Sequence, residues 1–172
     1  MQRWAIGVLA VMTLSAVARA QSVERGNWEL TLAGVGSSNK DFDSHAIGAN
    51  VGVGYFPLDF LELGLRQTIT YVDNADTSST DASTTLALDI HLPLGDRGRI
   101  VPFIGGTLGY YYGDTFSDSF EYGPEAGIKW FVNDTTFLFF RVEYQIFSND
   151  VFGSSESSDK QWVYGVGIGL RF

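Results

Sequence analysis

Bulky residues alternate with small or charged ones over the last stretch of the chain, from Trp162 to Phe172. Side chains of a strand point alternately to its two faces, so a period of two in the sequence predicts a β-strand. One face of this strand is apolar, and the other combines glycine with a charge. The bulky positions are Trp162, Tyr164, Val166, Ile168, Leu170 and Phe172, and those between them are Val163, Gly165, Gly167, Gly169 and Arg171.

Seven earlier segments repeat this alternation, and each has about the length of a tilted strand that crosses a bilayer, ~9–11 residues. No segment with a helical period competes with them. Gln67 falls on an otherwise apolar face, and we interpret it as the position of a β-bulge. The predicted strands are 27–36, 45–56, 60–72, 80–92, 100–112, 119–132, 136–147 and 162–172.

The connections between these segments alternate between short turns and longer polar loops. The short ones are 57–59, 93–99 and 133–135, and the longer ones are 37–44, 73–79, 113–118 and 148–159. Bacterial membrane barrels have short periplasmic turns and longer external loops. The chain is therefore predicted to be all-β, an eight-stranded antiparallel transmembrane β-barrel with both termini in the periplasm.

A soluble barrel with an apolar interior is the alternative to a barrel in a membrane. Roughly forty bulky side chains lie on the predicted apolar faces, whereas the interior of eight strands holds only a packed column or one small ligand. The apolar face is therefore predicted to contact lipid, and the face of glycine, threonine and alanine to line the interior. Aromatic residues mark both strand ends, as expected of two lipid–water interfaces: Tyr71, Tyr110, Tyr112, Tyr122, Tyr144, Trp162 and Tyr164 at the loop end, and Trp28, Tyr55, Trp130 and Phe172 at the turn end.

Charged residues on the polar faces are predicted to point into the barrel, where an unpaired charge is costly. A middle layer should hold Arg66, Glu125, Arg141 and Glu143, and a layer nearer the periplasm should hold Glu29, Glu62, Asp89, His91, Lys129 and Arg171. We expect bidentate arginine–carboxylate pairs in the middle layer to plug the lumen. Two interpretations stay open: a static polar core, and a gate that exchanges partners and admits small ions.

The N-terminal residues 1–20 have the features of a secretory signal peptide, with a basic start at Arg3, an apolar stretch and the cleavage site Ala18-Arg19-Ala20. The remaining 21–172 are predicted to form one barrel domain. The chain has no cysteine and a formal net charge of −9, which excludes a disulfide framework and disfavours nucleic acid as a partner.

The sequence offers few candidate catalytic residues. His45 and His91 are expected at opposite ends of the barrel, and the pair Asp89 and His91 lacks a serine nearby on its strand. We therefore predict no catalytic residue, no metal site and no cofactor. The acidic external loops could contact lipopolysaccharide through bridging divalent cations, because hard cations favour oxygen ligands; the alternative is a solvated, self-repelling crown.

The mature chain resembles the small outer-membrane β-barrel proteins that include the OmpA transmembrane domain and OmpX. The likeness is carried by the segments 103–110 (FIGGTLGY), 123–127 (GPEAG) and 163–172 (VYGVGIGLRF). The resemblance implies that the terminal Phe172 is a recognition signal for the outer-membrane assembly machinery. We also expect a monomer, with outer-membrane lipid and lipopolysaccharide as its partners.

Three functions are compatible with that resemblance, which by itself does not decide among them. The first is a structural or surface-interaction role in the cell envelope, with the lumen plugged by charged pairs. The second is a narrow channel for small ions, or for small hydrophobic solutes as in OmpW-like relatives. The third, and weakest, is a lipid-modifying barrel enzyme, for which we find no lipid-facing serine–histidine pair.

Overall fold

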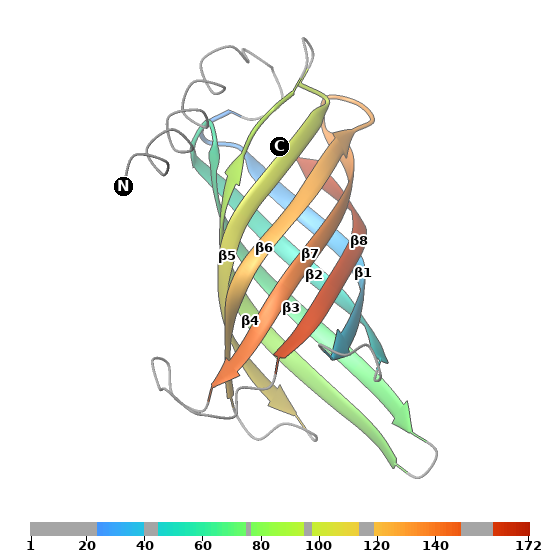
Figure 1. Ribbon diagram of the computed structural model, residues 1–172. Coiled ribbons are helices and arrows are strands. Elements are labelled where there is room, and N and C mark those ends of the chain that lie inside the picture. The colour runs from blue at the N-terminus through green and yellow to red at the C-terminus, as the bar shows by residue number, and fades with distance from the viewer. Residues whose placement is uncertain (1–23, 40–44, 75–76, 95–97, 114–118, 149–159) are drawn as a thin grey trace, which may run out of the picture.

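Eight antiparallel strands form one closed barrel in the computed structural model, which describes residues 24–39, 45–74, 77–94, 98–113, 119–148 and 160–172 (Figure 1). Each strand pairs with its neighbour in sequence, and β1 pairs with β8 to close the barrel. The described residues contain no helix that is long and apolar enough to cross a membrane. The strands are β1 (Trp28–Asn39), β2 (His45–Leu58), β3 (Leu61–Asn74), β4 (Thr77–His91), β5 (Ile100–Gly113), β6 (Ser119–Phe131), β7 (Thr136–Ser148) and β8 (Lys160–Arg171).

The eight predicted strands are confirmed, but the predicted loop 73–79 is wrong. Strands β3 and β4 continue through most of it, down to the pair Asn74↔Thr77. Pairing of strands depends on backbone groups, so polar side chains do not end it. In Figure 1 this hairpin extends furthest from the barrel, at the end opposite the C-terminus. The turn 57–59 is also shorter than predicted, because β2 runs to Leu58. The predicted signal peptide lies outside the described residues.

The two faces of the sheet differ as the alternation predicts. Outward side chains such as Leu32, Ile104 and Val166 are 56%, 58% and 64% exposed, while their strand neighbours point inward and are shielded. The inward set includes nearly all the buried charged groups of the described chain. The barrel is therefore apolar outside and polar inside, opposite to a soluble barrel.

The polar residue on the apolar face, Gln67, is not at a β-bulge. The register between β2 and β3 runs without a break past the pair Val51↔Gln67, and its irregularity lies instead between Tyr55 and Leu58. The Gln67 amide donates to the Tyr112 hydroxyl at 2.8 Å and accepts from the Thr84 hydroxyl at 2.7 Å. This polar residue is accommodated on the outer wall because its neighbours satisfy its hydrogen bonds.

Aromatic side chains also fill the interior at the turn end, which we define as the end bearing Trp28 and Phe172; the opposite end is the loop end. The glycine, threonine and alanine predicted to line the interior are therefore joined here by large aromatic side chains. Glycines on neighbouring strands leave space for these rings. A Cβ added at Gly169, for example, would lie 2.1 Å from the ring of Phe137. The buried rings at this end are Phe56, Phe103, Phe131, Phe137 and Phe139.

Candidate functional site

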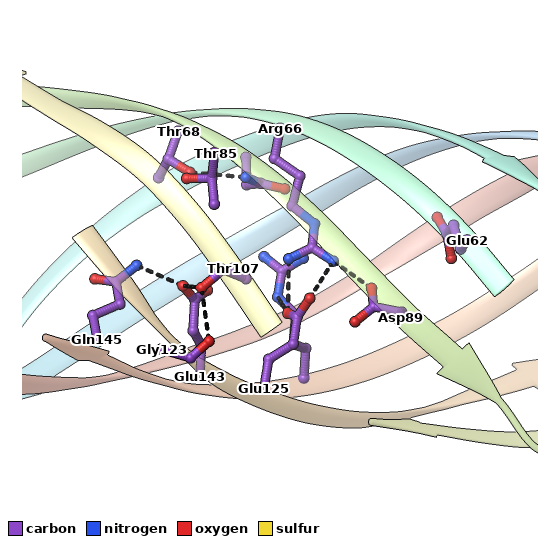
Figure 2. A network of polar contacts seen from close by, with 12 residues as sticks. Glu62, Arg66, Thr68, Thr85, Asp89, Thr107, Gly123, Glu125, Glu143 and Gln145 are labelled. Atoms are coloured by element: carbon purple, nitrogen blue, oxygen red, sulfur yellow. Dashed lines mark hydrogen bonds and ion pairs between the residues drawn. The ribbon is translucent and has the colours of Figure 1, made fainter. Parts of the chain in front are cut away.

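Arg66 of β3 binds two carboxylates from other strands in the middle of the lumen (Figure 2). Its Nη1 donates to Glu125 Oε2 at 2.7 Å and its Nη2 to Glu125 Oε1 at 2.9 Å, a bidentate pair. The same Nη2 also donates to Asp89 Oδ2 at 3.1 Å. Because Asp89 and Glu125 are both at most 2% exposed, this charge-assisted contact is shielded from water and links three strands across the barrel.

Arg141 and Glu143 of β7 also lie in the middle layer, as the sequence predicts, but they play different parts. Arg141 Nε is 3.6 Å from Glu125 Oε2, so Glu125 faces two guanidinium groups. Glu143 forms no ion pair with an arginine among the described residues. Its Oε1 instead accepts hydrogen bonds from Thr107 at 2.8 Å and Gln145 at 3.1 Å.

Lys129 of β6 sits in a cage of carboxylates and aromatic rings nearer the turn end. Its ammonium donates to Glu29 and, at 2.7 Å, to Glu62. The same Nζ lies 5.1 to 5.7 Å from three ring centroids, within the range of a cation–π contact. The rings belong to Phe56, Phe103 and Phe137.

Two residues differ from their predicted surroundings. Asp89, expected in the layer near the periplasm, joins the middle layer, because cross-strand register brings it through Gly105 to Glu125. Arg171, expected in the ion-pair network, has no ion pair within the described residues. Its Nη2 donates to the Asp134 carbonyl at 3.1 Å, and its guanidinium stacks over the ring of Phe131 at 4.2 Å.

Two further acids point into the lumen toward the loop end and were missing from the sequence-based inventory. Glu121 is 0% and Asp81 is 1% exposed, and Thr85 donates a hydrogen bond to Glu121. Strand parity could have found both, because Glu121 lies four residues before Glu125 and Asp81 eight residues before Asp89. The buried charges of the described chain are thus Glu29, Glu62, Asp81, Asp89, Glu121, Glu125 and Glu143 against Arg66, Lys129, Arg141 and Arg171.

Cavities beside the ion pairs are small. One of about 30 Å³ lies on the loop side of the middle layer and is lined by Arg66, Arg141 and Glu143. Another of about 20 Å³ lies between the middle layer and the lysine cage, against Asp89 and Lys129. Each is of the size that holds about one water molecule.

A larger groove, of about 520 Å³, opens on the outer wall beside Pro124. The pairs between β6 and β7 stop at Tyr122↔Ile146 and resume only at Glu125↔Glu143. Proline has no N–H to donate, which accounts for a gap in the ladder at this position. The groove is lined by Ile104, Pro124, Glu125, Ala126, Val142, Tyr144 and Trp162.

Neither histidine belongs to a candidate metal site in the part of the chain that the structure describes. No three His, Asp or Glu side chains are placed there to hold a metal ion. His91 is enclosed between the rings of Phe56 and Phe103, with Nε2 at 3.2 Å from Glu62 Oε2. His45 lies at the start of β2, at the other end of the barrel.

A closed barrel of eight antiparallel strands, apolar outside and charged inside, defines the class of small transmembrane β-barrels. No protein-family model and no curated protein sequence matches the chain, whereas solved structures share its fold.

The outer membrane protein OprG from Pseudomonas aeruginosa aligns over 89% of this chain and 99% of its own, with a TM-score of 0.64 and 13% identity. The N-terminal β-barrel domain of OprF from the same organism aligns over 86% and 98%, with a TM-score of 0.57 and 18% identity. Neisserial surface protein A aligns over 84% and 94%, with a TM-score of 0.58 and 14% identity. The chain therefore has the fold of the small outer-membrane barrels, a likeness of fold rather than of sequence.

Proposed function

We propose that this protein is an integral outer-membrane β-barrel with a structural or surface-interaction role in the envelope, its lumen closed by charged pairs. The observation that carries the proposal is the contact of Arg66 with Glu125 and Asp89, which joins β3, β4 and β6 across the lumen. Water-sized cavities of about 20 and 30 Å³ lie on either side of it. A barrel closed in this way serves as an anchor that presents its loops.

Placement in the outer membrane is supported by the apolar outer face and by the fold shared with OprG and the OprF barrel. We place the turn end and both termini in the periplasm, following the connection lengths of bacterial barrels. The loop end then faces outward, where lipopolysaccharide is the expected lipid partner. The barrel needs no second copy for closure, so we propose a monomer, exported by the segment 1–20.

The terminal Phe172 is proposed as the signal read by the outer-membrane assembly machinery. It is 74% exposed on the outer wall at the turn end. Its backbone is nevertheless held, because Phe172 and Trp28 exchange N–H···O bonds of 2.8 and 3.0 Å. An exposed aromatic side chain on a backbone that is held in place is accessible to a partner.

Single-channel recording in planar bilayers tests the closed lumen. The wild-type barrel should give no conductance steps, whereas Arg141→Ala and Glu125→Ala, which remove parts of the middle layer, should give small ones. Steps in the wild type equal to those of both variants would contradict the plug.

A second candidate function, passage of small hydrophobic solutes, is favoured by the groove at Pro124. The groove is open to the lipid side, is flanked by the paired rings of Tyr144 and Trp162 at 4.7 Å, and includes Glu125 among its lining residues. Pro124→Ala, which restores a backbone donor, should slow the uptake of an apolar dye into vesicles holding the barrel. Equal uptake by wild-type and empty vesicles would exclude this function.

A further inference from the structure

Four carboxylates lie in one cross-strand row that winds along the inner wall of the barrel. The register pairs Glu62 with Asp89, Asp89 with Gly105, Gly105 with Glu125, and Glu125 with Glu143. Neighbouring strands are about 4.8 Å apart, so Glu62 and Asp89 are direct neighbours, as are Glu125 and Glu143. Asp89 and Glu125 are two strands apart, with only Gly105 between them. Figure 2 shows these four side chains in that order, starting with Glu62 on the side of the turn end.

The one position in the row without a side chain is filled by its neighbour. A Cβ at Gly105 would lie 2.0 Å from Asp89 Oδ1 and 2.3 Å from the Leu88 carbonyl oxygen. Glycine at this position therefore lets the Asp89 carboxylate lean toward Glu125. As a result both carboxylates reach the same nitrogen, Nη2 of Arg66.

Like charges directly opposite each other on paired strands are unfavourable, yet this row contains the pairs Glu62↔Asp89 and Glu125↔Glu143. Side-chain cations occupy the row and offset the repulsion. The Lys129 ammonium contacts Glu62, the Arg66 guanidinium bridges Asp89 and Glu125, and Arg141 lies against Glu125. The row is thus a series of cation sites, and the cations in them are side chains of the barrel itself.

These tethered cations do not balance the buried carboxylates. Glu143, at the loop side of the row, is held by the hydroxyl of Thr107 and the amide of Gln145. Further toward the loop end, Glu121 Oε2 is buried with no hydrogen-bond partner. Buried carboxylates without a cationic partner are costly, and a small cation from solution offsets that cost.

We propose that this row is a binding path for small monovalent inorganic cations such as K⁺, so that the lumen accepts cations and rejects anions. Carboxylate oxygens are ligands for hard cations, and rings of acidic side chains select cations in channels. The inference rests on the proposed closed lumen, in which the guanidinium and ammonium groups are the resident occupants of the path. Removing one of them vacates a site for a cation from solution.

Arg66→Gln removes the guanidinium that bridges Asp89 and Glu125 and tests the proposal without requiring a current. Urea unfolding of the folded barrel in neutral vesicles would be compared in KCl and in N-methyl-D-glucamine chloride at equal ionic strength. The organic cation is too large for the cavities of about 20 and 30 Å³. When the K⁺ concentration is about ten times the dissociation constant of K⁺, the ratio of folded to unfolded Arg66→Gln should be about tenfold higher in KCl than in the organic salt.

Arg171→Gln is the matched control, because it removes the same charge from the lumen at a residue outside the row. It should show no preference for K⁺, and the double variant Arg66→Gln with Glu125→Gln should lose most of the effect. Equal stability of Arg66→Gln in the two salts, or an equal response of Arg171→Gln, would overturn the proposal.

Any current through Arg66→Gln in planar bilayers provides a second readout, since it should be carried by K⁺ rather than by Cl⁻. A current carried mainly by Cl⁻ would also overturn the cation path. Conductance of the wild type would contradict the closed lumen but not this inference. The inference is decided by comparing how K⁺ affects the stability of Arg66→Gln and of Arg171→Gln.

Discussion

Arg66 is the side chain that pairs two buried carboxylates in the middle of the lumen, and two of its properties allow this. Its guanidinium offers a fork of donors that fits Glu125 bidentately, and a remaining interaction reaches Asp89. All three groups are buried, so each carboxylate depends on the cation for the solvation it has lost. Removing Arg66 deprives two buried carboxylates, Asp89 and Glu125, of their shared cation, which costs more than the contacts contribute.

The double-mutant cycle of Arg66→Met and Glu125→Met measures this dependence. Each single variant should lower the free energy of unfolding by about 3–5 kcal/mol, because it leaves a buried charge without its partner. The double variant should lose clearly less than the sum of the two, since both charges are then gone. Urea unfolding in lipid vesicles gives the values, and additive losses would show that the two side chains are not coupled.

Strands β7 and β8 illustrate how elements are fitted to each other by size. The pair Phe137↔Gly169 sets a ring against a residue without a side chain, and the pair Phe139↔Gly167 repeats this arrangement one step along. Both rings are buried in the interior of the turn end, where Phe137 also contacts the Lys129 ammonium. Gly169 is therefore required by the ring opposite, and not by its own backbone angles, whereas a Cβ at Gly167 would also meet the Leu32 carbonyl oxygen at 2.2 Å.

Gly169→Ala tests this fit, with Gly34→Ala as its control. A Cβ at Gly169 would lie 2.1 Å from the Phe137 ring, whereas one at Gly34, on the outer wall, would meet nothing within 4 Å. Overpacking should destabilise Gly169→Ala by about 1–3 kcal/mol, while Gly34→Ala should change stability by much less. Adding Phe137→Leu should recover part of the loss at Gly169. Equal unfolding midpoints for the two alanine variants would contradict the fit.

At the scale of the whole molecule, the sequence predicts those features that depend on the residue pattern within a single strand. The period of two gave the eight strands, their inward and outward faces and the middle position of Arg66 and Glu125. Register between strands is not contained in that pattern, so the alignment of Asp89 with Glu125 through Gly105 could not be foreseen. The period of two also does not show in which direction a long side chain extends. For this reason the prediction that Arg171 joins the ion-pair network was wrong.

At the same scale, the account depends on the barrel turning its apolar face to lipid and its charges inward. Spin labels at Leu88, Leu138 and Ile168, which are 50%, 44% and 46% exposed on the outer wall, test this in reconstituted vesicles, with a label at Asp59 in an exposed turn as the control. Lipid-soluble oxygen should relax the three outer labels strongly, and a water-soluble relaxer should reach only the label at Asp59. Outer labels that respond to the water-soluble relaxer and are shielded from oxygen would contradict the account.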